Sequence, residues 1–144
     1  MILKSEVETA AAGAALARVA RASDVITLSG PLGVGKTALA RGFIAALGHE
    51  GEVPSPSFAI VQPYEELDPS VWHVDLYRIE DASEIEELGL DAATDAALLV
   101  EWPERAGTNA WPQALGLSLA FAQNGARILT AKVPPSWEER WPPQ

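Results

Sequence analysis

The chain has 144 residues, of which 48% are hydrophobic and 21% are charged. This length and composition are typical of one globular domain with a single core, and they exclude a disordered chain. The absence of cysteine excludes disulfide bonds, thiolate metal ligands and cysteine nucleophiles. Because the formal net charge is −10, the surface repels phosphate backbones, and direct binding of nucleic acid is disfavoured.

The acidic side chains are concentrated in one stretch of the chain. From Glu65 to Glu104 there are thirteen acidic residues and one basic residue, Arg78. Two interpretations remain open, a well-solvated face or a docking surface for a basic protein. The N-terminus lacks a signal-peptide layout, and no apolar run reaches the ~18 residues of a membrane span. We therefore expect a cytoplasmic protein that does not associate with a membrane.

The first two elements expected along the chain are a helix and a strand. Ser5 and Glu8 have the spacing of a capping box, and the stretch that follows is rich in alanine. This pattern predicts a helix over Ser5–Arg21. The β-branched apolar run Val25–Leu28, bounded by turn residues, predicts a buried strand.

A glycine-rich loop then leads into a second predicted helix. Leu39, Phe43 and Leu47 recur at the spacing of one helical face, and Gly48 stands where a C-terminal cap belongs. Further along, Phe58–Gln62 is a plausible strand.

Two more strands are predicted in the acidic half of the chain. Val71–Ile79 alternates between two faces, and Ala97–Val100 is a short apolar run typical of a buried strand. Between them, Ser83 and Glu86 have the spacing of a second capping box, which predicts a short helix ending at Gly89.

The last predicted elements form a hairpin. Two apolar segments, Leu115–Ala122 and Arg127–Val133, flank the Asn124-Gly125 pair that suits a tight turn. We expect a single domain over residues 1–134 and a tail rich in proline and tryptophan over 135–144, which is loose or packs late. The alternation of strands and helices predicts an α/β three-layer sandwich of the P-loop NTPase type, with a mostly parallel sheet and an antiparallel edge hairpin.

Residues Gly30–Thr37 read GPLGVGKT and match the G-x-x-x-x-G-K-[ST] pattern of a phosphate-binding P-loop. Lys36 would bring its charge to the phosphates, and the Thr37 hydroxyl would reach Mg²⁺. Pro31 has no amide hydrogen to donate. The backbone amides expected to bind ATP belong to Gly30, Gly33, Val34, Gly35 and Ala38.

Two acidic residues on predicted strands are candidates for the metal and catalytic site. Glu101 directly follows the apolar run Ala97–Val100, and Asp75 lies within the alternating strand, two residues after His73. We expect Glu101 to be linked to the metal and Asp75 to the metal or the attacking water. His73 is either a proton-transfer group or a hydrogen-bonded structural residue. Ser57 could contact the γ-phosphate or Mg²⁺ from its loop.

Four motifs in this order resemble the TsaE (YjeE) family, the small P-loop ATPases of bacterial tRNA threonylcarbamoyladenosine synthesis. The pair HVDLYR and VEWPER at this spacing is much more specific than the P-loop alone. The motifs are GPLGVGKT at Gly30–Thr37, SPSF at Ser55–Phe58, HVDLYR at His73–Arg78 and VEWPER at Val100–Arg105.

The resemblance implies an ATPase that acts with two protein partners, TsaB and TsaD, and meets tRNA only through them. The partners transfer a threonylcarbamoyl group to the adenosine beside the anticodon, and ATP hydrolysis resets the complex. The positions that the resemblance implies are Lys36 for the phosphates, Thr37 and Glu101 for Mg²⁺, Asp75 as the second acidic group, Ser57 in place of a family threonine, and Thr9 near the adenine.

The sequence departs from the family pattern at two of these places. Pro31 occupies a P-loop position that is usually acidic, and Ser57 replaces threonine while keeping the hydroxyl. Beyond Arg105 the match is faint, so Arg127 as a nucleotide contact is only a hypothesis.

Three other functions compete with the ATPase interpretation. The main alternative is a small-molecule or nucleoside kinase, although the scattered arginines do not suggest the lid that such enzymes close. A GTP-dependent switch would need an N-K-x-D guanine motif, which the sequence lacks. A non-catalytic nucleotide-binding module would bind ATP without turnover.

Overall fold

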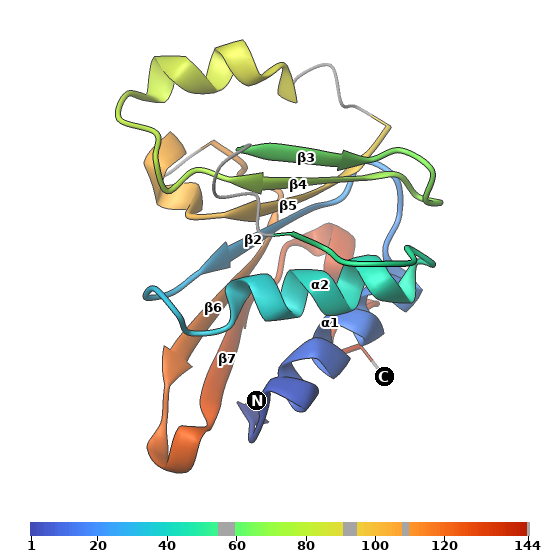
Figure 1. Cartoon of the computed structure of the whole chain (residues 1–144), viewed down its shortest axis with the longest axis vertical. Coiled ribbons are helices and arrows are strands. Elements are labelled where there is room, and N and C mark those ends of the chain that lie inside the picture. Colours follow the sequence, from blue (N-terminus) through green and yellow to red (C-terminus); the bar gives the residue numbers. More distant parts are fainter. Residues whose placement is uncertain (55–59, 91–94, 108–109, 144) are drawn as a thin grey trace.

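The computed structural model describes residues 1–54, 60–90, 95–107 and 110–143. The strands within these residues form one sheet of seven, in the order β1-β7-β6-β2-β5-β4-β3 (Figure 1). The strands are β1 (Ile2–Leu3), β2 (Val25–Ser29), β3 (Val61–Tyr64), β4 (Val71–Asp75), β5 (Ala97–Glu101), β6 (Leu115–Phe121) and β7 (Arg127–Lys132).

Parallel pairing in the middle of the sheet is flanked by antiparallel pairing at both edges. β2 pairs in parallel with β5 and β6, and β4 pairs in parallel with β5. β7 pairs antiparallel with β6 and β1, and β3 pairs antiparallel with β4. The predicted α/β class and the β6–β7 hairpin are confirmed. The antiparallel pairing of β1 and β3 was not expected, and β1 with two residues is too short to show a pattern. The strand predicted over Phe58–Gln62 overlaps β3 at Val61 and Gln62, but β3 continues to Tyr64, and the predicted residues 58–59 lie outside the described part of the chain.

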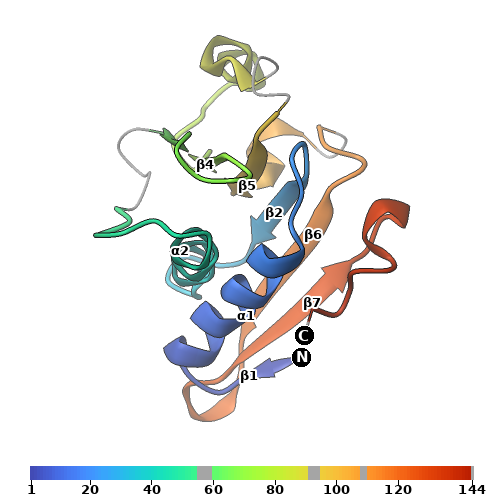
Figure 2. The same cartoon turned by 90° about the vertical axis from the view of Figure 1, so that its right-hand side faces the viewer.

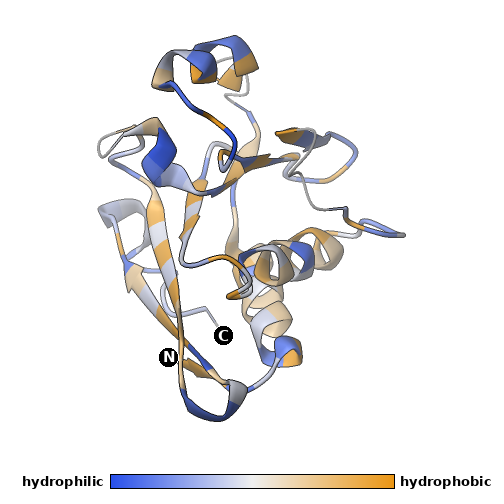
Figure 3. Ribbon diagram, turned by 60° about the vertical axis from the view of Figure 1, so that its left-hand side comes forward, coloured by the Kyte–Doolittle hydropathy of each residue, from blue (hydrophilic) through white to orange (hydrophobic). Residues whose placement is uncertain are grey.

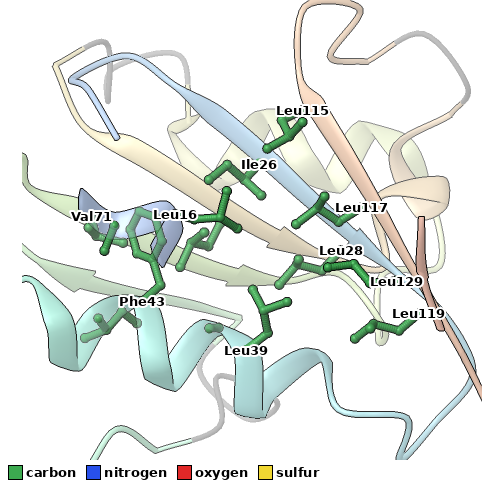
Figure 4. Close-up of a cluster of buried hydrophobic side chains, with 14 of the residues drawn as sticks. Leu16, Ile26, Leu28, Leu39, Phe43, Val71, Leu115, Leu117, Leu119 and Leu129 are labelled. Atoms are coloured by element: carbon green, nitrogen blue, oxygen red, sulfur yellow. The ribbon is translucent and has the colours of Figure 1, made fainter. Parts of the chain in front are cut away.

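Two α-helices of the described chain, α1 (Glu6–Val19) and α2 (Lys36–Ala46), lie side by side on one face of the sheet (Figure 2). Leu16 of α1 and Leu39 and Phe43 of α2 point into the core between helices and sheet (Figure 4). Short 3-10 helices complete the regular structure of the described residues. They are η1 (Ala82–Leu88), η3 (Pro103–Ala106), η4 (Gln123–Gly125) and η5 (Pro135–Trp137).

A second, smaller core fills the opposite face beside β4 and β5. Val74, Leu98 and Val100 point to this side, where Ile85 and Leu88 of η1 pack against them. The alternation predicted for Val71–Ile79 therefore separates the two faces as expected, although the strand itself ends at Asp75. Colouring by hydropathy shows hydrophobic central strands and a hydrophilic turn between β6 and β7 (Figure 3).

The ends of two predicted helices are partly corrected by the structure. Ser5 does cap α1, its Oγ accepting from the backbone N–H of Glu8 at 3.2 Å, but α1 ends at Val19 rather than Arg21. The predicted capping box at Ser83 and Glu86 is wrong. Asp81 is the cap, since its carboxylate accepts from the Ser83 backbone while Glu84 reaches back to the Asp81 backbone. An aspartate that was not considered as a cap starts η1 two residues earlier, and Gly89 ends it as predicted.

The C-terminal segment packs onto the body of the protein. Trp137 is 1% exposed and belongs to the main core. The guanidinium of Arg140 donates to both carboxylate oxygens of Asp24, at 2.8 and 3.0 Å, and to the carbonyl of Val19 at 2.9 Å. Of the two expectations for the tail, loose or packed, the structure shows packing, because Trp137 joins the main core and Arg140 finds partners that lie more than one hundred residues away in sequence.

Close contact between α1 and α2 depends on glycine. A Cβ atom on Gly13 would lie 2.0 Å from the carbonyl oxygen of Leu39, and one on Gly42 would lie 2.0 Å from that of Ala10. Both distances are far below van der Waals contact, so any side chain would push the helices apart. Each glycine costs the helix up to ~1 kcal/mol of intrinsic propensity, which the closer packing of the two helices offsets.

We expect Gly42→Ala to lower the free energy of unfolding by about 1–3 kcal/mol, although alanine is the better helix former. The physical reason is the clash of the new methyl group with the α1 backbone. Urea denaturation followed by circular dichroism measures the change. Gly116→Ala on β6 is a matched control, because its Cβ would meet no atom closer than 3.6 Å. Equal stability of the Gly42 variant and the parent would contradict the requirement for glycine.

Candidate functional site

The GPLGVGKT loop joins the end of β2 to the start of α2, as the sequence predicts for a P-loop. Gly30, Gly33 and Gly35 have φ angles of 146°, 79° and 120°, in the region that favours glycine. Gly35 is the N-cap of α2, so the free amides of the first helical turn open at the loop. Val34 is 1% exposed and anchors the loop in the core. The loop therefore combines the backbone freedom and the helix terminus that phosphate binding needs.

Lys36 is buried at the start of α2 and directed at its own loop. Its Nζ atom donates to the carbonyl oxygens of Gly30 and Pro31, the latter at 3.1 Å, and lies 3.8 Å from the ring centroid of Trp102. Burial lowers the pKa of the Lys36 ammonium below its ordinary value, and the nearby carboxylates of Glu101, Glu104 and Asp75 oppose this shift. The carboxylates thus favour the charged form that could meet a phosphate.

Thr37, Glu101 and His73 form a hydrogen-bonded group next to the loop. The Thr37 hydroxyl donates to the carboxylate of Glu101, at 3.0 Å from Oε1 and 3.1 Å from Oε2. On the other side, Nε2 of His73 lies 2.7 Å from Oε2 of Glu101. Glu101 is 2% exposed and His73 is fully buried. The group comes from three separate elements, α2, β5 and β4.

Asp75 stands beside Glu101 because β4 and β5 run parallel with these two residues in register. Its Oδ1 atom accepts from the backbone N–H of Tyr77 at 2.9 Å, and the residue is 5% exposed. The two carboxylates thus end neighbouring strands at the same edge of the sheet, the edge at which the P-loop lies. Both acids are delivered by strands as expected, but Asp75, predicted to lie within a strand that reaches Ile79, stands at the last residue of β4.

A cavity of about 280 Å³ lies between the P-loop and the two strand ends. It brings together most of the residues predicted for the site. Its lining includes Gly33, Gly35, Lys36, Thr37, Ala38, Asp75, Glu101 and Trp102.

A second hollow of about 210 Å³ adjoins the first across the P-loop, which contributes Gly33 and Gly35 to both. Thr9 lines it from α1 and Arg127 from β7, where the Nε atom of Arg127 donates to the carbonyl of Val34 at 2.8 Å. Thr9 is thus separated from the acidic residues but lies against the same loop. Its expected place near the adenine of a nucleotide stays a prediction.

The oxygen donors of the site suit a magnesium ion. The Thr37 hydroxyl and the Glu101 carboxylate are already in contact, and Asp75 lines the same cavity. Among the described residues no three His, Asp or Glu side chains form a group able to hold a metal by themselves. Mg²⁺ binds through one or two carboxylates together with substrate phosphates, so this incomplete set of protein ligands fits it when a nucleotide is present.

Two features of the site were not settled by sequence reasoning. His73 was open between proton transfer and a structural role, and the structure places it on Glu101. Trp102 has φ of 58° and lies over the Lys36 ammonium, a contact that no sequence pattern indicates. Alternation along the strand was the available signal for His73, because it puts this residue on the same face as Asp75. Ser57 lies outside the residues that the structure describes.

Comparison with known proteins identifies the family. The family model for "Threonylcarbamoyl adenosine biosynthesis protein TsaE" matches residues 3–129. The chain belongs to the TsaE family. The match includes the P-loop, both acidic strand ends and the first half of the β6–β7 hairpin, and the predicted family resemblance is confirmed.

Relatives of this family share sequence and fold with the chain. A TsaE protein of Haemophilus influenzae is 39% identical over 92 residues, which are 62% of this chain and 58% of that protein. One of Streptomyces coelicolor is 44% identical over 96 residues, 64% of this chain and 65% of the relative. Both carry the name tRNA threonylcarbamoyladenosine biosynthesis protein TsaE. The matches thus span less than two thirds of these relatives' length.

Two further relatives match over more of the chain. A Rickettsia conorii protein of the same name is 34% identical over 128 residues, covering 88% of this chain and 73% of the relative. The crystal structure of YdiB from Bacillus subtilis superposes with a TM-score of 0.80 at 30% identity, covering 96% of this chain and 87% of YdiB. The α/β fold described above is therefore one that a solved structure also has.

Proposed function

We propose that this chain is a Mg²⁺-dependent ATPase subunit required for threonylcarbamoyladenosine modification of tRNA beside the anticodon. The observation that carries the proposal is the contact of the P-loop Thr37 hydroxyl with the Glu101 carboxylate, which ends a buried parallel strand beside the loop. This pairing is the usual arrangement for Mg²⁺ in P-loop NTPases. Family membership supports the tRNA-modification role, since the relatives carry that name.

The residues of the site would divide the work of ATP hydrolysis among them. The amides of the P-loop and of the first turn of α2 would hold the β- and γ-phosphates, and Lys36 would neutralise their charge. Thr37 and Glu101 would hold Mg²⁺, which supplies charge neutralisation on the β- and γ-phosphate oxygens. Asp75, which faces the same cavity, would orient the attacking water or a water bound to the metal. Thr9 and Arg127 would line the side toward the base.

The protein would work in the cytoplasm through partners that resemble TsaB and TsaD. Its net charge of −10 disfavours direct contact with tRNA, so tRNA would be reached through the partner complex. Exposed carboxylates of η1 and its neighbourhood, including Glu84, Glu86 and Glu87, belong to the acidic stretch seen in the sequence. These carboxylates could bind a basic surface of a partner protein.

The contacts of three arginines favour an ATPase over a small-molecule kinase. Arg127 is bound to the carbonyl of Val34, and Arg140 is paired with Asp24 on the far side of the core. Arg105 lies beside the ring of Tyr77. None of these three is carried by a segment that forms a lid over the P-loop. A cavity of about 600 Å³ lies on the opposite face of the sheet, and its lining, which includes Thr27 and Lys132, contains no residue of Gly30–Thr37.

The deciding measurement is phosphate release from ATP by the purified chain, alone and with the TsaB–TsaD complex and tRNA. We expect slow release by the chain alone and a rate at least tenfold higher with the partners. Parallel assays with candidate nucleosides and metabolites test the kinase alternative. A phosphorylated acceptor, or ATP binding without turnover even in the presence of the partners, would contradict the proposal.

A further inference from the structure

His73 lies deeper in the sheet than the residues that line the nucleotide cavity. It sits in the middle of β4, on the face that carries Val71 and Asp75 toward α2. The side chain is fully buried, and it is absent from the lining of the cavity that Asp75 and Glu101 share. His73 is therefore placed to act on the site through another residue and not on a bound nucleotide directly.

All the hydrogen bonding of this imidazole is directed at Glu101. Nε2 lies 2.7 Å from Oε2 of Glu101, whereas Nδ1 has no partner among the residues that the structure describes. An ionised carboxylate can only accept hydrogen bonds, so toward ionised Glu101 the donor is the Nε2–H group of His73. A buried Nδ1 without a partner carries a desolvation penalty. If His73 only filled space in the core, no interaction would offset this penalty, so we attribute the presence of histidine here to its bond with Glu101.

Thr37 by itself would leave the Glu101 carboxylate free to turn. Its hydroxyl lies at almost equal distances, 3.0 and 3.1 Å, from the two carboxylate oxygens and does not distinguish between them. The bond from His73 is made to Oε2 alone. It therefore selects one rotation of the carboxylate and leaves Oε1 without a second protein partner among the described side chains.

We propose that His73 is a positioning residue, which holds Oε2 of Glu101 so that the carboxylate is oriented for a divalent cation before the nucleotide arrives. The inference rests on the proposed function, because it assigns Glu101 to the metal. Residues that orient a metal ligand from behind typically change metal affinity 10–100-fold when they are removed. Nucleotide held by the P-loop without metal does not need this bond.

Two amide substitutions at residue 73 distinguish the effect of the hydrogen bond to Glu101 from the effects of side-chain polarity and packing. In His73→Gln the longer side chain can place an N–H group near the position of Nε2, whereas in His73→Asn the shorter one cannot reach Oε2. Tyr64→Phe is a matched control, because the Tyr64 hydroxyl is the other buried polar atom without a described partner and does not contact Glu101. His73→Leu repeats the test with an apolar side chain if the asparagine variant does not fold.

The readouts are Mn²⁺ affinity of the ATP complex by electron paramagnetic resonance and ATP affinity in EDTA, each beside a melting curve. We expect His73→Asn to weaken Mn²⁺ binding about 10–100-fold, with His73→Gln and Tyr64→Phe within about threefold of the parent. ATP affinity in EDTA should be the same in all four proteins. Equal Mn²⁺ affinity of the Asn variant and the parent, or an equal loss in the Gln variant, would overturn the proposal.

The same data separate this inference from the proposed function. The nucleotide and metal site as a whole would be refuted if the parent protein failed to bind ATP in EDTA. It would also be refuted if, without EDTA, the parent protein with ATP failed to bind Mn²⁺. Loss of ATP affinity in EDTA together with Mn²⁺ affinity in the Asn variant would show a general structural role for His73 and would overturn positioning alone.

Discussion

Glu101→Gln is expected to lower ATP turnover at least about 100-fold, the scale observed when one preorganised electrostatic group is removed from an active site. The substitution keeps the shape of the side chain but removes the negative charge that would hold Mg²⁺. Glutamine can still accept from Thr37 or His73 through its oxygen, so the core around this buried position should be retained. Steady-state phosphate release at several Mg²⁺ concentrations, in the presence of the partner proteins, measures the effect.

A melting curve and ATP binding in EDTA show that the Glu101 variant is folded and retains the P-loop. Glu138→Gln serves as the matched control, because Glu138 is an exposed glutamate of the C-terminal segment far from the P-loop in sequence. We expect this control to hydrolyse ATP like the parent. Normal turnover by Glu101→Gln would show that the carboxylate does not serve the metal, and the assignment of the site would fail.

Lys36→Ala should weaken ATP binding by at least about 30-fold, the lower end of the cost of truncating one partner of a buried, hydrogen-bonded charge pair. The Lys36 ammonium is buried beside three carboxylates and the P-loop carbonyls, and no other lysine lines the cavity. Its removal leaves the negative charges of Glu101 and Asp75 facing the triphosphate. Isothermal titration with ATP and Mg²⁺ measures the loss.

Lys132→Ala is the control for this substitution, since Lys132 is exposed and lines the cavity on the other face of the sheet. It changes the net charge by the same amount at a distance from the P-loop. ATP affinity should therefore stay within about twofold of the parent in this variant. An equal loss in both variants would mean that Lys36 acts through overall charge and not through contact with the phosphates.

The two predictions differ in the step that they affect. Lys36 is expected to contact the phosphates directly, so its loss should appear in nucleotide affinity even without metal. Glu101 is expected to act through Mg²⁺, so its loss should appear mainly in turnover and in the dependence on metal concentration. Measuring both quantities in both variants therefore distinguishes a phosphate ligand from a metal ligand.

Local pattern was sufficient wherever neighbours in sequence decide the structure. The spacing of GPLGVGKT predicts a loop between strand and helix, because glycine readily adopts the positive φ angles found at Gly30, Gly33 and Gly35. Short apolar runs predict β2 and β5, and a strand that ends in Glu101 places a carboxylate at the edge of the sheet. Asn124-Gly125 marks the turn of the β6–β7 hairpin.

The prediction from sequence was wrong where two neighbouring residues could each cap the same helix. Asp81 and Ser83 can both start a helix, and the sequence does not rank them. The structure selects Asp81 because its carboxylate and that of Glu84 bond reciprocally to the backbone. The sequence also left the tail undecided between loose and packed, because Trp137 joins the main core and Arg140 pairs with Asp24 and Val19, which lie more than one hundred residues away in sequence.

The amino-acid sequence by itself determined the family, the fold class and the chemistry available at the P-loop, because backbone freedom, strand patterning and charge are local properties. Only the tertiary structure decided how that chemistry is assembled. Thr37, His73 and Glu101 meet because β4 and β5 pair in register and α2 lies across them, and strand order is a long-range property that no short pattern contains. The close approach of α1 and α2 at Gly13 and Gly42 likewise becomes visible only when the two helices are packed together.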